Sequence, residues 1–168
     1  CHNATDRALG LSLASYADVA AGSRFGSSVI PFRPDRSHLL LHMTGALEPR
    51  MPLATDPLDD AAIRLIRRWI ERGAANDDTA PMYSEVTAKA FVACQGENKV
   101  AVLDLASGRL IREIDVAAPH SVYVDEARRR VFVSRFENST ENLHVYDADT
   151  LELVQTGRAG TYPALLRI

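Results

Sequence analysis

The spacing of apolar residues divides the sequence into two regions that meet near residues 75–81. The end of the first region carries an apolar stripe with intervals of three and four residues, the period of an amphipathic helix. The stripe consists of Ile63, Ile66, Trp69 and Ile70. The charged residues between them are expected to face water; they are Arg64, Arg67, Arg68, Glu71 and Arg72. The pattern therefore predicts one strongly amphipathic helix here.

Residues that favour helix ends flank this stripe. Asp56 can cap a helix N-terminus, Pro57 suits the first turn, and Gly73 favours a helix end. A second, weaker helix is predicted over residues 35–43, and residues 9–22 are expected to mix short helix with loop. The first region is thus predicted to be mainly helical, with long loops.

The second region contains short stretches in which apolar and polar residues alternate, which is the period of a β-strand. Turn-forming segments such as 96–98 and 106–108 separate these stretches. The predicted strands cover residues 90–94, 100–105, 110–116, 121–124, 130–134, 143–146 and 151–156. The second region is therefore predicted to be all-β.

The strand pattern occurs twice. The matching pairs are Val92 and Val133 at a shift of 41 residues, Asp104 and Asp147 at 43, and Pro119 and Pro163 at 44. A unit of ~40 to 45 residues with four strands has the size of one β-propeller blade, and a closed propeller needs ~4 to 8 blades. An antiparallel meander or sandwich is the alternative. We expect about two blades, belonging to a fragment of a longer protein, with both aspartates accepting hydrogen bonds from the turns that follow their strands.

These patterns predict a mixed fold class with two domains, a small all-α domain followed by an all-β partial β-propeller. The domains are placed at residues 1–75 and 83–168. The segment between them, residues 76–82, is small and polar and contains Pro81, as a linker does.

Composition and charge narrow the function classes. Apolar residues make up 46%, charged residues 24%, and the net charge is −3, which favours a folded globular protein. No apolar run approaches the ~18 to 20 residues of a membrane-spanning helix. The basic runs at 67–68 and 128–130 are interpreted as solvated faces, so no nucleic-acid partner is expected. The sequence also lacks the common nucleotide-binding, zincin and serine-hydrolase motifs.

Candidate chemistry lies at the start of the chain and in one loop. Cys1 and His2 match the end of a C-x-x-C-H motif, which attaches haem covalently. Met51 lies between two prolines just before the amphipathic helix, where its thioether could be an axial ligand opposite an imidazole. Met43 and Met82 are rival ligands. Alternatively, Cys1 is the lipidated residue of a lipoprotein and Met51 is core filler.

Further histidines and a cysteine have less distinctive settings. His38 and His42 could place two imidazoles on one helix face for a metal, but no third ligand accompanies them, so we interpret them as the polar face of a helix. His120 and His144 could meet in a propeller channel. Cys94 is expected to be a buried strand residue.

The first region resembles the planctomycete-type cytochrome c domain. The matching motifs are Ser15-Tyr16-Ala17, Ala21-Gly22, Val29-Ile30-Pro31, Pro34, Ser37-His38-Leu39-Leu40, Pro49-Arg50-Met51-Pro52 and Trp69-Ile70-Glu71-Arg72-Gly73-Ala74. This resemblance implies haem c and its iron as cofactor, with Cys1 in the thioether bond, His2 as proximal ligand and Met51 as distal ligand. Ile63, Ile66 and Trp69 would then form the wall of the haem pocket. The first Cys and the N-terminal helix of that family are absent from this sequence.

The second region is similar to YVTN-type β-propeller repeats. The matching segments are 91–93, 98–104, 108, 119–122, 131–134, 145–147 and 163. Together the resemblances imply a c-type cytochrome module for electron transfer, attached to a propeller in a periplasmic or cell-surface protein, because haem c is attached outside the cytoplasm. The alternative is a non-redox surface lipoprotein whose propeller is a binding platform. The redox partner, the propeller substrate and whether the full-length protein is an enzyme stay open.

Overall fold

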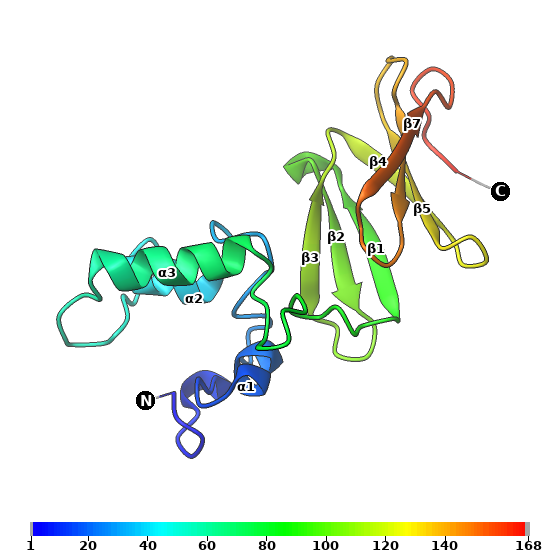
Figure 1. Ribbon diagram of the computed structural model, residues 1–168. Coiled ribbons are helices and arrows are strands. Elements are labelled where there is room, and N and C mark those ends of the chain that lie inside the picture. Colours follow the sequence, from blue (N-terminus) through cyan, green and yellow to red (C-terminus); the bar gives the residue numbers. More distant parts are fainter. Residues whose placement is uncertain (1, 167–168) are drawn as a thin grey trace. The chain divides into compact units, whose positions relative to one another are not determined.

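The computed structural model describes residues 2–166, and two antiparallel sheets dominate it (Figure 1). The helical elements are η1 (Ala8–Gly10), α1 (Tyr16–Ala21), α2 (His38–Thr44), α3 (Asp60–Glu71) and η2 (Gln95–Glu97). The strands are β1 (Lys89–Cys94), β2 (Lys99–Asp104), β3 (Leu110–Asp115), β4 (Pro119–Asp125), β5 (Arg130–Arg135), β6 (Leu143–Asp147) and β7 (Leu153–Gly157). The sheets have the strand orders β1-β2-β3 and β4-β5-β6-β7.

The chain divides into two compact units. The first comprises Cys1–Val86 and Ser107–Arg112, and the second comprises Thr87–Ala106 and Glu113–Ile168. The longest helix of residues 2–166 has 12 residues, so no helix in this range is long enough to cross a bilayer.

The predicted fold class, an all-α domain followed by an all-β partial propeller, is wrong. More of the described residues lie in strands than in helices, and α1 has only 6 residues and α2 only 7. The first unit is mainly loop, and it includes the segment Ser107–Arg112, which contains the start of β3. Helices this short offer little surface for helix-on-helix packing, so loops supply much of the core instead. The domain boundaries at 75 and 83 stay a prediction.

Helix α3 confirms the amphipathic helix of the sequence, with one change at its start. The carboxylate of Asp59, not that of Asp56, caps the helix by accepting a hydrogen bond of 2.7 Å from the backbone N–H of Ala62. At the other end, Gly73 has a φ of 94°, and a Cβ there would lie 2.6 Å from Cζ of Phe32. Both conditions favour glycine, so the predicted role of Gly73 at the helix end is confirmed.

The core of the first unit joins α2 and α3 to the loops. Its buried apolar residues are Val29, Leu40, Ile70, Ala74 and Met82. The segment after α3 folds back onto the helix, since the backbone N–H of Met82 donates to the carbonyl of Gly73 at 2.9 Å. Within it, Oδ1 of Asn76 accepts hydrogen bonds from the backbone N–H groups of Asp78 and Ala80. This segment therefore forms an ordered, hydrogen-bonded loop.

All seven predicted strands are present, each within two residues of its predicted ends. The two repeated aspartates also have the expected role. Oδ1 of Asp104 accepts from the backbone N–H of Ala106 at 3.0 Å, and Oδ1 of Asp147 accepts from those of Asp149 and Thr150 at 2.9 and 3.0 Å. These bonds fix the same turn in both repeats and lower the pKa of Asp147.

The two antiparallel sheets follow the sequence repeat, and the first has one strand fewer than the second. By the repeat, β1-β2-β3 matches β5-β6-β7, and the second sheet has one further strand, β4, paired with β5. Among residues 2–166 the first sheet has no counterpart of β4. Val92 on β1 is consequently 44% exposed, whereas its repeat partner Val133 on β5 is fully buried and opposite Val122 of β4.

This difference predicts unequal stability effects for two matched substitutions. Val133→Ala should lower the free energy of unfolding by about 2 kcal/mol, because it removes two fully buried methyl groups and leaves a cavity. Val92→Ala should lower it by less than about 0.5 kcal/mol. Chemical denaturation of the two variants measures this, and equal losses would show that β1 is as well covered as β5.

Candidate functional site

The predicted iron ligands belong to the first unit. Cys1 lies outside the described residues. His2 is half-buried, and its backbone carbonyl accepts a hydrogen bond of 2.8 Å from the N–H of Leu13. Its ring nitrogen Nδ1 is buried and has no hydrogen-bond partner among the described residues. A buried imidazole nitrogen normally has a partner, so this one is available to a ligand.

The loop that carries Met51 is held to the end of α2. The backbone N–H of Met51 donates to the carbonyl of His42 at 2.9 Å. Nδ1 of His42 lies 3.0 Å from the carbonyl oxygen of Pro49, and since a carbonyl only accepts, this nitrogen carries the proton. The N–H of Arg50 donates to the carboxylate of Glu48 at 3.0 Å. Met51, which is half-buried, therefore lies in an anchored loop.

Arg50 is a candidate site residue that the sequence analysis missed. Its Nη2 donates to the carbonyl of Thr55 at 3.1 Å, and its side chain packs against Gly45, where a Cβ would lie 3.1 Å from Cδ. Nη1 is buried without a partner among the described residues. An unpaired buried donor costs about 1–3 kcal/mol, more when charged, so Nη1 suits an anionic acceptor. The signal in the sequence that could have identified Arg50 is its position directly before Met51-Pro52.

These two nitrogens are the buried side-chain polar atoms without a partner in residues 2–166. One belongs to His2, a predicted iron ligand. The other belongs to Arg50, which directly precedes Met51, the second predicted iron ligand. A haem group offers both an iron centre for an imidazole and carboxylates for a guanidinium. The residues present thus fit this group by chemistry.

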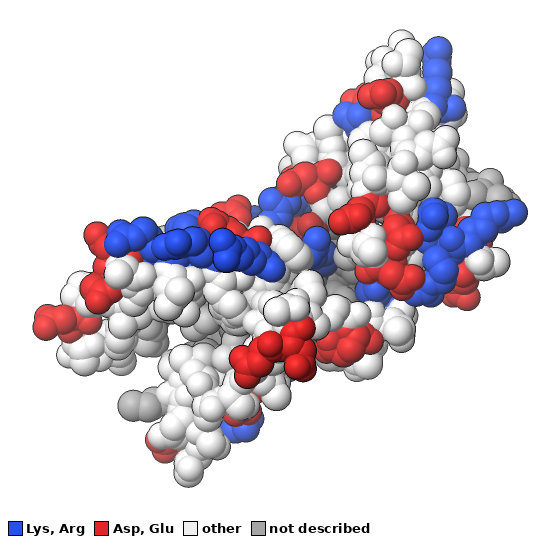
Figure 2. All heavy atoms as spheres, in the orientation of Figure 1, with Lys and Arg blue, Asp and Glu red and all other residues white. Residues whose placement is uncertain are grey.

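The predicted pocket residues Ile63, Ile66 and Trp69 lie on one face of α3. All three are half-buried and pack against the core of the first unit. Trp69 is oriented by a hydrogen bond of 2.9 Å from its indole N–H to the carbonyl of Ala75. In Figure 2 the charged side chains of this helix form a row, and the surface below that row is mostly white and notched.

The structure excludes one of the two rival methionines. Met82 is 4% exposed and belongs to the core with Leu40 and Ile70, so it is unavailable as a ligand. Met43 is half-buried on α2. Cys94 is half-buried, which corrects its predicted burial, because β1 is an edge strand.

The remaining histidines have separate partners. The rings of His38 and His42 lie 6.4 Å apart in an edge-to-face arrangement. His120 stacks on Phe136 at 5.0 Å, and its Nδ1 lies 2.8 Å from the carbonyl of Ala164. No cluster of three or more His, Cys, Asp and Glu side chains that could hold a metal occurs in the part of the chain that the structure describes.

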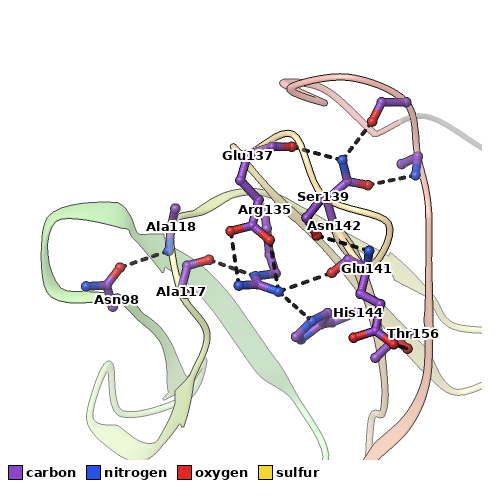
Figure 3. A network of polar contacts seen from close by, with 12 residues as sticks. Asn98, Ala117, Ala118, Arg135, Glu137, Ser139, Glu141, Asn142, His144 and Thr156 are labelled. Atoms are coloured by element: carbon purple, nitrogen blue, oxygen red, sulfur yellow. Dashed lines mark hydrogen bonds and ion pairs between the residues drawn. The ribbon is translucent and has the colours of Figure 1, made fainter.

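His144 belongs to a polar network centred on Arg135, at the end of β5 (Figure 3). The guanidinium of Arg135 pairs with the Glu137 carboxylate at 3.0 Å and donates to the carbonyls of Ala117 and Glu141 at 3.1 Å. Its Nη1 also lies 3.3 Å from Nε2 of His144. These contacts tie the loop after β5 to the segment before β4.

This network fixes the protonation of His144. Arginine only donates, so Nε2 of His144 accepts, and Nδ1 carries the proton and donates to the Tyr146 hydroxyl at 3.1 Å. Burial, and then the charge of Arg135, lower the pKa of His144. Burial also raises the pKa of Tyr146. A neutral imidazole beside a fixed cation fits a structural role.

The lowered pKa of His144 predicts a pH dependence of stability. Below 6.5, the ordinary pKa of an unfolded histidine, the unfolded chain binds a proton at His144 more readily than the folded chain does, so the free energy of unfolding should rise as the pH is raised towards 6.5. His144→Gln should flatten this slope, and the same change at the exposed His38 is the control. Urea titrations across this range measure it; an unchanged slope in His144→Gln would contradict the assignment.

Comparisons with known proteins give a slight structural likeness. No protein-family model matches the chain, and no curated protein matches it. The chain is similar to a solved structure titled "Dihydro-heme d1 dehydrogenase NirN in complex with DHE", with 20% sequence identity and a TM-score of 0.40. The match covers 85% of this chain and 37% of that one, so this chain spans well under half of that protein's length.

Proposed function

We propose that the first unit binds haem c and passes single electrons, with Cys1 in the covalent link and His2 and Met51 as the axial ligands. The observation that carries this proposal is the buried, unpartnered nitrogen of His2. It is supported by the anchored loop that contains Met51. The proposal concerns this ligand set and does not restore an all-α cytochrome domain.

Each of the assigned residues would have a definite role in this function. The iron of a bound haem would supply one-electron chemistry, and histidine–methionine ligation raises its potential relative to two nitrogens. Ile63, Ile66 and Trp69 would exclude water and lower the local dielectric. The free Nη1 of Arg50 would donate to a propionate carboxylate, which would satisfy its missing hydrogen bond.

This ligand set favours electron transfer over bond chemistry. Both axial positions would be filled by protein side chains, which leaves no open position for a substrate. The propeller-like unit would then hold the redox partner or a substrate of the full-length protein. Since haem c is attached outside the cytoplasm, the protein would act in the periplasm or at the cell surface.

Titration of the purified chain with ferric haem, followed by its Soret absorbance, tests the proposal. The wild-type chain should bind one haem. His2→Ala and Met51→Ala should each weaken binding at least about tenfold, because each removes one axial ligand. Met43→Ala is the matched control, since Met43 is also half-buried and lies in the same unit.

The contrary outcomes are distinct. Binding that is unaffected by either ligand substitution would remove the assigned ligands. No change in the haem spectrum on titration would remove the haem, and would favour the alternative in which the propeller-like unit is a non-redox binding platform.

A further inference from the structure

Four arginines form an exposed row along α3, which is visible as the long blue band in Figure 2. They are Arg64, Arg67, Arg68 and Arg72, and all four are exposed. Three of them follow one another at intervals of four residues, which places them on one helix face over about 12 Å. We refer to these four residues as the α3 stripe.

The arginines of the α3 stripe are unpaired. None has a hydrogen bond or an ion pair from its side chain to any of residues 2–166. The other arginine run of the sequence is different, because Arg128 pairs with Asp125 at 2.7 Å, Arg130 pairs with Asp147 at 2.7 Å, and Arg129 pairs with an aspartate of the β6–β7 turn. Of two similar arginine runs in the sequence, one thus forms ion pairs in the structure and the other does not.

An unpaired row of like charges is unfavourable for the isolated helix. Like charges four residues apart on a helix destabilise it by roughly 0.2–0.5 kcal/mol per pair. Arg68 lies in the last turn, near the negative end of the helix dipole, which offsets only part of this cost. The acidic residues nearest to the stripe on the helix, Asp60 and Glu71, form no ion pair with it among the described residues, so an opposite charge from outside the unit would stabilise the stripe.

The surroundings of the stripe restrict what could bind there. Leu65 lies within the row of arginines and is 65% exposed, which provides an apolar contact beside the charges. Asp59 and Asp60 lie at one end of α3 and Glu71 at the other, and they would repel a long polyanion that ran past the stripe. A short cationic row with an apolar contact and acidic ends suits a protein interface, in which arginine is enriched and pairs bidentately with carboxylates.

We propose that the α3 stripe docks an acidic protein surface, one that presents carboxylates spaced along a helix with an apolar side chain among them. Complementary charge of this kind accelerates and orients association more than it raises affinity. The proposal goes beyond haem binding and holds whether or not the unit carries haem. If it does, the stripe is where an acidic electron-transfer partner would dock.

The test uses a fluorescent helical peptide with glutamate at every fourth position and a leucine between them. Its anisotropy is measured with the full chain, with Arg64→Gln/Arg68→Gln, and with Arg24→Gln/Arg158→Gln, at low and at physiological salt. The control removes the same net charge from two other exposed arginines that form no ion pair within the described residues. We expect the stripe variant to bind roughly tenfold more weakly at low salt, and the control to change less than about twofold.

Two further arms decide the class of partner. Leu65→Ser should weaken binding of the peptide without affecting binding of a duplex oligonucleotide. Equal losses in the stripe variant and the control would overturn the proposal, since the attraction would then be general. Tighter binding to the oligonucleotide or to phosphatidylserine vesicles than to the peptide, lost in the stripe variant, would also overturn it in favour of a phosphate surface.

Discussion

Burial of a nitrogen without a hydrogen-bond partner costs free energy, and the interpretation of the first unit depends on this constraint. Elsewhere in the unit, buried polar groups are satisfied: the fully buried hydroxyl of Ser37 accepts from the N–H of Ile30 and donates to the carbonyl of Arg33. His2 and Arg50 are different, since each has a buried nitrogen without a hydrogen-bond partner among the described residues. The loop between α2 and α3 therefore leaves a donor unpaired next to Met51, while its other groups hold the loop in place.

In the second unit, the repeated strands and turns supply the hydrogen-bond partners of the polar groups. The strands satisfy one another within two antiparallel sheets, and the aspartate at the end of each equivalent strand accepts hydrogen bonds from the turn that follows. The first sheet lacks a counterpart of β4, and the exposure of Val92 marks the edge where such a strand would pair. The network of Arg135 and His144 likewise gives the polar groups of the loop after β5 their partners. We therefore interpret this network as structural and not as a reactive site.

Features that depend on interactions between residues close in sequence could be predicted, and features that depend on distant residues could not. Strand period, turn chemistry and the amphipathic stripe of α3 are local, so all seven strands and the role of Gly73 were found from the sequence. The helix cap is Asp59 and not the predicted Asp56, because several aspartates lie close together before the helix and each could act as the cap. The all-α prediction failed because loop residues such as Val29 and Met82 fill core positions that were expected from helices.

Other features depend on contacts that no local pattern encodes. Arg50 is half-buried, and the burial of its Nη1 without a hydrogen-bond partner depends on the folded loop, which the motif Arg50-Met51-Pro52 alone does not reveal. Arg135 and His144 are nine residues apart, and the loop between them brings them together. The arginines of α3 were predicted to face water, but their lack of acidic partners, in contrast to residues 128–130, is visible only in three dimensions.

The most direct test of the central claim is X-ray absorption at the iron edge of the chain loaded with haem. Iron held by His2 and Met51 should show one sulfur scatterer in its first shell, and this contribution should be absent in Met51→Ala and present in Met43→Ala. A first shell of nitrogen and oxygen alone in the wild-type chain, or a sulfur contribution that persists in Met51→Ala, would contradict the assignment of the axial ligands.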